Sequence, residues 1–204
     1  MRGTEFSWFD VPERLADQFD DVAALRLPGH KPFKLAVTMD SYLNKIEEIA
    51  DGEDDLILIG HSMGGAVITH FAAKFPDRVK RLIYVAAMLP KAGDTIGGLS
   101  LSFGVDDDAI EEEFEKAGID DDDPALGAQP PLPLLAALPD EPKVADLPKH
   151  YVLCKDDLII PAPHQTLMIA NWDDVEVIEL DSGHFPQKKA TDALMTALEG
   201  FISG

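Results

Sequence analysis

Two kinds of hydrophobic pattern alternate along the chain. Short continuous apolar runs, such as residues 56–59, are bounded by glycine or polar residues and are typical of strands buried on both faces of a parallel sheet. Longer stretches repeat their apolar positions with helical spacing, as Met39, Leu43 and Ile46 do within residues 39–50. The alternation predicts an α/β fold with a mostly parallel sheet and helices on both faces.

The predicted elements follow this alternation over most of the chain. We expect helices over residues 13–19, 39–50, 63–75 and 190–202, part of a helix over residues 167–172, and strands over residues 22–27, 56–59, 82–87, 151–154 and 175–180. Asp10 and Pro12 are typical of a capped first helix, and Pro76 ends the third one.

Residues 89–147 interrupt the alternation. They contain several glycines, the proline-rich stretch QPPLPLLAALPDEP, and 11 of the chain's 38 acidic residues between Asp106 and Asp123. Asp108 is a candidate cap for a short helix that carries apolar residues at Ile110, Phe114 and Ala117. We therefore expect one domain, residues 1–204, with an insertion over about residues 89–147 that has no core of its own.

Composition and charge narrow the function classes. The 204 residues are 46% apolar and 27% charged, which fits one globular domain. Acidic residues outnumber basic ones 38 to 17, and the net charge of −21 disfavours nucleic acids and anionic membrane surfaces as partners. No apolar run approaches the roughly 18 residues of a membrane span, and the opening MRGTEFSWFD lacks the apolar core of a secretory signal. The single cysteine, Cys154, agrees with a reducing compartment, so we expect a cytoplasmic location.

The motif that carries most chemistry is GHSMGG at residues 60–65. It lies where the apolar run LILIG ends and a predicted helix begins, which is the context of a G-x-S-x-G nucleophile elbow. Ser62 would be held in a strained turn, and glycines on either side would let strand and helix approach closely. The amide N–H of Met63 would lie at the helix N-terminus and donate to an oxyanion.

A serine hydroxyl needs a base and a group that orients the base. Asp156 and Asp157 follow the predicted strand 151–154, and His184 follows the strand 175–180. Carboxyl ends of parallel strands meet at one edge, where open α/β sheets place their sites. The chain order serine, aspartate, histidine is the one expected for a nucleophile elbow, and the pattern leaves both aspartates open as the acid. His61, adjacent to Ser62, is expected to support the elbow.

Other residues give weaker indications. The histidines lack metal-ligand spacing, so we expect neither a metal nor another cofactor. Candidate residues for an apolar pocket, each equally compatible with packing, are Trp8, Phe9, Phe103, Phe114 and Leu134.

From about residue 7 onward the sequence resembles the α/β-hydrolase family, and within it the small esterases of the plant methylesterase and hydroxynitrile lyase group and their bacterial relatives. The matching pieces are LPGH, LILIGHSMGG, AAMLP, CKDDLIIP and LDSGHFP. The resemblance implies Ser62 as nucleophile, Asp157 as acid and His184 as base, with the insertion as a cap that shapes substrate choice. Phe185 stands where the lyases carry a lysine, which favours ester hydrolysis.

The opening residues depart from the family pattern. Family members begin with a strand that ends in His-Gly beside the nucleophile strand and supplies, through its loop, a second oxyanion amide. That strand is apparently absent, and RGTEFSWFDVPERLA resembles the stretch that follows it. Two interpretations are open: a chain beginning at an internal methionine, or a cloning scar in MRGTEF. Under truncation, restoring the strand should raise esterase rate and melting temperature.

Together these patterns predict a serine hydrolase that cleaves a small carboxylic ester through an acyl-enzyme. Its partner would be a small-molecule ester, without nucleic acid or membrane, and a homo-oligomer is left open. The alternatives are a non-catalytic hydrolase-fold binding or regulatory protein, or the same triad acting on a lactone, a thioester or a C–C bond.

Overall fold

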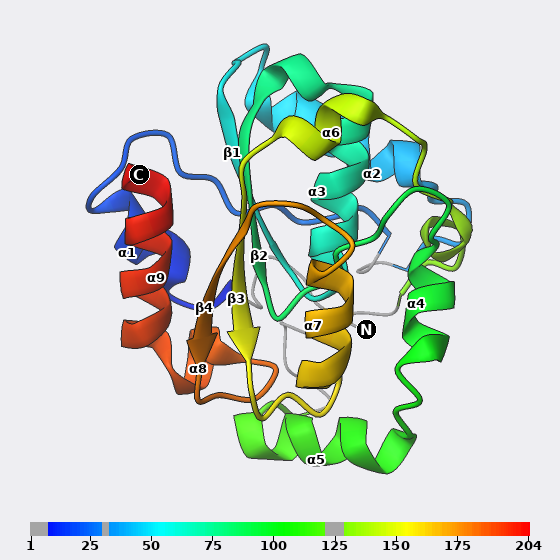
Figure 1. Cartoon of the computed structure of the whole chain (residues 1–204), viewed down its shortest axis with the longest axis vertical. Helices are drawn as coiled ribbons and strands as arrows, with labels where there is room; N and C mark the ends of the chain where they lie inside the picture. Colours follow the sequence, from blue (N-terminus) through cyan, green and yellow to red (C-terminus); the bar gives the residue numbers. More distant parts are fainter. Residues whose placement is uncertain (1–7, 30–32, 121–128) are drawn as a thin grey trace.

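A four-stranded parallel sheet forms the centre of the molecule (Figure 1). The computed structural model describes residues 8–29, 33–120 and 129–204. The strands lie side by side in chain order and are β1 (Leu56–His61), β2 (Val79–Val85), β3 (Lys149–Cys154) and β4 (Val175–Leu180). Every neighbouring pair is parallel, so the predicted α/β class and the parallel sheet are confirmed.

Helices cover both faces of the sheet, as predicted. In chain order they are α1 (Val11–Ala16), α2 (Met39–Ala50), α3 (Met63–Lys74), α4 (Ile96–Ser102), α5 (Asp107–Ala117), α6 (Pro142–Asp146), α7 (Ala162–Ile169), α8 (Pro186–Lys189) and α9 (Thr191–Ser203), with 3₁₀ turns at η2 (Pro76–Arg78) and η3 (Leu132–Leu135). Helices α1 and α9 lie on one side of the sheet, and α2, α3 and α7 lie on the other (Figure 1).

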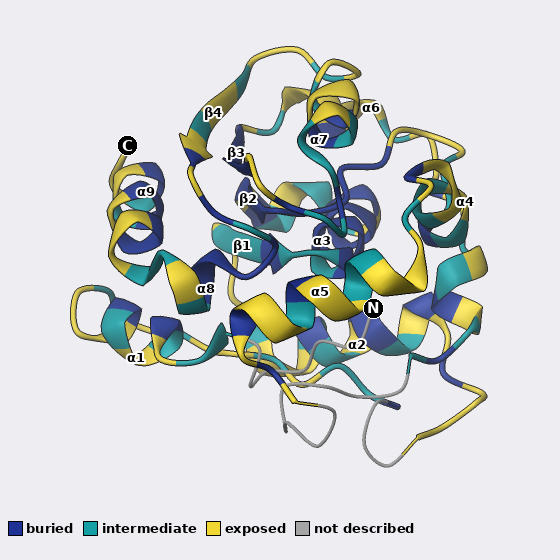
Figure 2. Cartoon of the chain, turned by 90° about the horizontal axis from the view of Figure 1, so that it is seen from below, coloured by how far each residue is buried: buried dark blue, intermediate teal, exposed yellow. Residues whose placement is uncertain are grey.

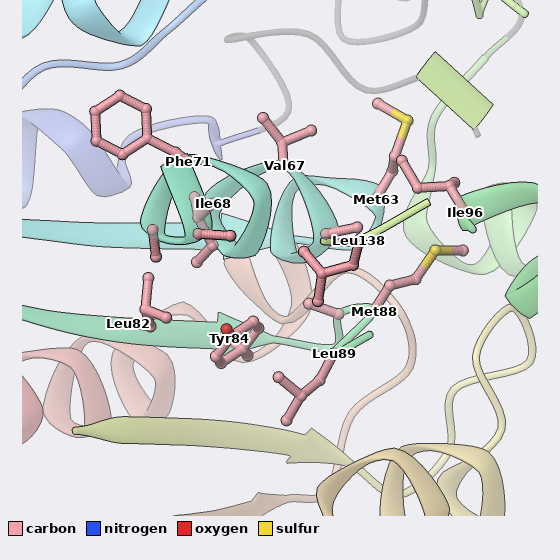
Figure 3. Close-up of a cluster of buried hydrophobic side chains, with 14 of the residues drawn as sticks. Met63, Val67, Ile68, Phe71, Leu82, Tyr84, Met88, Leu89, Ile96 and Leu138 are labelled. Atoms are coloured by element: carbon pink, nitrogen blue, oxygen red, sulfur yellow. The ribbon is translucent and has the colours of Figure 1, made fainter. Parts of the chain in front are cut away.

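Alternate strand residues divide the core into two apolar layers. On β2, Leu82 and Tyr84 belong to the layer under α3, whereas Ile83 and Val85 belong to the layer under α9. Successive side chains of a strand point to opposite faces, so a continuous apolar run fills both layers at once. Figure 3 shows part of the α3 layer, in which Leu82 and Tyr84 lie with side chains of α3.

The strand expected over residues 22–27 is not formed. Residues 22–27 lie outside any helix or strand, although Leu25 and Leu27 pack against the core. A strand requires a hydrogen-bonded neighbour, and within the described ranges β1 pairs with β2 alone. Within the described ranges β1 has a neighbouring strand on one side only, so most of its residues are half-buried. The sequence predicts burial on both faces.

Helix boundaries differ from the expected ones mainly at the caps. The side chain of Asp106, and not that of Asp108, accepts a hydrogen bond from the amide of Ala109 at the start of α5 (2.9 Å). Asp10 precedes α1 in a helical conformation and makes no side-chain cap. Residues 167–172 were expected to be part of a helix, but α7, which starts after Pro161, ends at Ile169. Side-chain capping depends on backbone angles that composition does not set.

The insertion between β2 and β3 packs directly on the sheet. Its buried residues Ile96, Phe103, Leu138 and Val144 belong to the same apolar cluster as the α3 layer. Helix α5 lies across the carboxyl end of the strands (Figure 1), and many of its residues are exposed (Figure 2). None of the helices in the described ranges has the length and apolarity of a membrane span.

Candidate active site

Ser62 lies at the sharp turn between β1 and α3. Its φ of 55° and ψ of −126° place it in a region that side-chain-bearing residues rarely adopt, as expected for an elbow. Its amide donates to the carbonyl of Val85 (3.3 Å), which holds the turn against the end of β2. A Cβ at Gly60 would lie 2.6 Å from the backbone of both Gly64 and Gly65, so only glycine fits there.

The glycines after Ser62 have unequal roles. A Cβ at Gly65 would lie 2.4 Å from the carbonyl oxygen of Met88 and 2.8 Å from the Cβ of Ala87. At Gly64 a Cβ would meet nothing within 4 Å. The expectation that both glycines flanking the serine allow close approach is therefore right for Gly60 and wrong for Gly64. Gly65 is the residue that lets α3 approach the segment after β2.

The loop after β4 brings His184 to the serine. The imidazole Nε2 of His184 lies 2.9 Å from Ser62 Oγ, and its Nδ1 lies 2.9 Å from Asp157 Oδ2. Because a carboxylate only accepts, the proton belongs on Nδ1, and Nε2 faces the hydroxyl as an acceptor. His184 is 2% exposed, so protein groups rather than water surround the ring. This arrangement can take a proton from the hydroxyl.

The structure separates the two candidate acids. Asp157 is 3% exposed, and its Oδ1 accepts from the amides of Ile159 and Ile160 (2.8 Å each) while Oδ2 faces His184. Asp156 is exposed and uses its amide to donate to the carbonyl of Ser182 (3.0 Å). Asp157 is therefore the aspartate brought to the imidazole.

Two buried polar residues that the sequence analysis missed support this acid–base pair. Gln165 on α7 is fully buried, accepts from the amide of Cys154 (3.1 Å), and donates to the carbonyls of Cys154 (3.0 Å) and Ile160 (2.7 Å). Its amide also approaches Asp157 Oδ2 (3.4 Å). The only local signal is that Gln165 precedes the buried Met168 by three positions on one helix face.

The second missed residue is Glu113 of α5. It is 3% exposed, and its two carboxylate oxygens accept from the amides of His184 (2.6 Å) and Leu158 (3.1 Å). The acidic block hides this residue in the sequence. Its spacing to the apolar Ile110 and Ala117 was the available signal, because an acid at i+3 in an apolar stripe faces the protein.

His61 lies beside the site as a support for its backbone. Its Nε2 donates to the carbonyl of His184 (2.7 Å), and its Nδ1 lies 3.4 Å from the amide nitrogen of Gln187. Burial, then the neighbouring His184, lowers the pKa of His61 to about 3, against the smaller effect of its hydrogen bond to the His184 carbonyl. A neutral ring that already donates from Nε2 is not placed to act as the base.

Met63 is the first residue of α3, so its N–H has no acceptor within the helix. The positive end of the α3 dipole lies at this turn and favours negative charge beside Ser62. This is the expected position of an oxyanion donor.

A cavity of about 760 Å³ opens onto Ser62 and His184. Among the expected pocket residues, Trp8, Phe103 and Phe114 line it. Phe9 instead packs against the cluster of Ala117, Ile119 and Phe185, and Leu134 packs on the α3 layer. The lining is mostly apolar and includes residues of α4 and α5, so the insertion forms part of the cavity wall.

In the described ranges, no group of three or more His, Cys, Asp or Glu side chains is arranged to hold a metal ion. Cys154 is a buried free thiol whose pKa is raised chiefly by burial and further by nearby carboxylates, including Asp157. It therefore stays a thiol at neutral pH and is not a competing nucleophile.

Known proteins are similar to this chain in sequence and in fold. The pyrethroid hydrolase of Sphingobium wenxiniae is 28% identical over 215 residues, covering 88% of this chain and 77% of the relative. Methylesterase 2 of Arabidopsis thaliana is 25% identical over 169 residues, covering 66% of this chain and 64% of the relative. These relatives confirm the resemblance to small esterases.

Solved structures are similar to this chain in fold. The pyrethroid hydrolase of Sphingobium faniae superposes with a TM-score of 0.84 at 26% identity, covering 99% of this chain and 94% of the other. The Arabidopsis methylesterase MES16, at 20% identity, supports the fold alone, with a TM-score of 0.75 and coverage of 98% and 94%. The sequence model of the alpha/beta hydrolase family matches residues 3–197. The chain therefore belongs to the alpha/beta hydrolase family and is a carboxylesterase-like hydrolase.

Proposed function

We propose that this hydrolase cleaves small carboxylic esters through an acyl-enzyme formed on Ser62. The observation that carries the proposal is the pair of 2.9 Å contacts that joins Ser62 Oγ to His184 Nε2 and His184 Nδ1 to Asp157 Oδ2. In this proposal Ser62 is the nucleophile, His184 the base and Asp157 the acid that orients the imidazole and stabilises its charged form.

The reaction has two halves. Ser62 Oγ attacks the ester carbonyl carbon while its proton moves to His184 Nε2, and the Met63 N–H stabilises the oxyanion. The C–O bond to the alcohol then breaks, the alcohol takes the proton from His184, and the acyl group stays on Ser62. In the second half, water attacks the acyl carbonyl and gives a proton to His184, which returns it to Ser62 as the carboxylic acid leaves.

The cavity supports neutral, apolar esters as the substrate class. Phe103 and Phe114 contribute aromatic surface to the cavity lining, and Ile59 and Val67 contribute aliphatic surface. Relatives named for pyrethroid and methyl ester hydrolysis agree with this class. The strongly acidic segment in the insertion would disfavour anionic esters.

We also propose that residues 1–204 form one domain in which residues 89–147 act as a cap. The packing of Ile96 and Leu138 into the sheet's core and the position of Phe114 in the cavity wall support this organisation. A cytoplasmic location agrees with the free thiol of Cys154.

The decisive experiment replaces Ser62 by alanine. Hydrolysis of a short p-nitrophenyl ester should fall to the background rate, and a fluorophosphonate probe should label the wild type but not Ser62→Ala. Ser203→Ala at the exposed end of α9 is the matched control and should keep full activity and labelling. An unlabelled, inactive wild type would support a non-catalytic binding protein, and full activity in Ser62→Ala would remove Ser62 from the mechanism.

A further inference from the structure

We propose that Glu113 is a positioning residue that locks the loops of Asp157 and His184 together beneath α5. The inference rests on the proposed function, since it assigns Glu113 a role through the proposed base and acid. One carboxylate oxygen of Glu113 accepts a hydrogen bond from the His184 amide (2.6 Å), and the other accepts one from the Leu158 amide (3.1 Å).

These contacts begin where the sheet stops. The β3–β4 ladder ends at the pair Cys154 and Leu180, and two further bonds, Lys155 N to Leu180 O and Asp156 N to Ser182 O (3.0 Å each), extend it into the loops. Beyond them, both loops present an N–H. Two donors cannot bond to each other, so a group with two acceptors is needed to join the loops there.

A glutamate carboxylate supplies those two acceptors, and a glutamine cannot. The amide of glutamine has one acceptor oxygen, and its NH₂ group would face one of the backbone N–H donors. Lys116 on the same helix pairs with the exposed Glu112 (2.7 Å). The hydrogen bonds of Glu113 come from backbone N–H groups. Burial of the carboxylate is tolerated because both oxygens are hydrogen-bonded.

The loop after β4 is shaped to receive this carboxylate. A Cβ at Gly183 would lie 2.1 Å from the Oε1 of Glu113, so glycine at this position leaves the space that the carboxylate occupies. Phe185 follows His184 and packs with Ala117 and Ile119 at the end of α5 and just after it. The carboxylate of Glu113 binds the amide of His184, and Phe185, the next residue, makes the apolar contact. Both contacts attach α5 to the loop that carries His184.

The same helix also faces the substrate cavity. Phe114, the next residue, and Ile110 line the cavity that opens onto Ser62. One helix thus contributes to the cavity wall and holds the backbone of the proposed base. A displacement of about 1 Å in a catalytic group can lower the rate about 100-fold, so loosening this clamp should act on kcat.

Glu113→Gln is the test, and Glu111→Gln is the matched control, because it removes the same charge from an exposed position of α5. With a short p-nitrophenyl ester, well below the melting temperature, Glu113→Gln should lower kcat about 10- to 100-fold and change KM less than about threefold. The rate of Ser62 labelling by a fluorophosphonate should fall in parallel. Glu111→Gln should stay within about twofold of the wild type in all three quantities.

A folded Glu113→Gln with the kcat of Glu111→Gln would overturn the proposal, and so would a change confined to the melting temperature. If Glu113→Gln does not fold, Gly183→Ala is the second test of the proposal. Its added methyl group pushes the Glu113 carboxylate away, and the carboxylate keeps its charge. This variant should lower kcat with little change in KM, and an unchanged kcat would contradict the clamp. Failure of the proposed function looks different, since then the wild type itself is neither active nor labelled.

Discussion

The two halves of the site are built in different ways. On the side of the proposed nucleophile, backbone geometry and glycines fix Ser62: a positive φ at the serine and the close approaches at Gly60 and Gly65. On the side of the proposed acid and base, two buried polar side chains hold the loops: Gln165 from the helix that follows the Asp157 loop, and Glu113 from the distant helix α5. A strained turn can be encoded within six consecutive residues, whereas two loops that leave neighbouring strands need groups from elsewhere in the chain to bind them together.

The largest effect should come from breaking the acid–base half at its carboxylate. Asp157→Asn should lower kcat about 10⁴-fold, because the amide favours the wrong imidazole tautomer and cannot stabilise the charged ring. Steady-state kinetics on a p-nitrophenyl ester measures it. The adjacent, exposed Asp156→Asn removes the same charge and should keep nearly full activity. Equal losses in the two variants would contradict the assignment of Asp157.

An intermediate effect is expected in the nucleophile half. Gly65→Ala places a methyl group 2.4 Å from the Met88 carbonyl oxygen, which should lower the free energy of unfolding by about 3 kcal/mol through forced movement of α3. Gly64→Ala, with nothing within 4 Å of the added carbon, should change it by less than about 1 kcal/mol. Chemical denaturation measures both, and equal stability of the two variants would show that α3 does not closely pack there.

The smallest effect concerns His61, which lies between the two halves of the site, and the dependence of protein stability on pH. His61 has a pKa lowered from 6.5 to about 3, so below pH 6.5 the unfolded chain binds a proton that the folded protein does not. Its contribution to stability is full above pH 6.5 and is lost progressively as the pH falls toward 3. Between pH 7 and 5 the loss is about 1 to 2 kcal/mol, or a few degrees in melting temperature.

His61→Gln removes this linkage. The variant should lose fewer degrees in melting temperature than the wild type when the pH is lowered from 7 to 5, as scanning calorimetry would show. An equal decrease in melting temperature for His61→Gln and the wild type would mean that His61 takes up a proton equally well in the folded and unfolded states.

Much of the fold was predictable from periodicity. The bounds of α2 and β4 agree with the expected residues, and β1, β2, β3, α3 and α9 lie within three residues of theirs. The elbow was equally accessible, since strand, G-x-S-x-G and helix are adjacent in the chain. The pair Asp156 and Asp157, and His184, were candidates because each follows a predicted strand, and parallel strands bring such loops to one edge. The resemblance to the family, and not the residue pattern, named Asp157 between the two aspartates.

Three features escaped the sequence because they depend on neighbours that are distant in the chain. Residues 22–27 have the composition of a strand but find no strand partner in the described structure. The apolar β1 is only partly buried because it pairs on one side. Glu113 looks like one more acid in an acidic block, and only the folded chain sets it against two backbone amides.

The amino-acid sequence by itself determined most of the alternation of strands and helices, the strained serine turn, and the meeting of Ser62, His184 and one of two adjacent aspartates at one edge of the sheet. These depend on side-chain periodicity and local sterics, which act over a few residues. Tertiary structure decided which polar side chains join the loops, and it separated Asp157 from Asp156, which the residue pattern had left open. Burial and hydrogen-bond partners are properties of the assembled chain, because each is created when segments far apart in sequence come into contact.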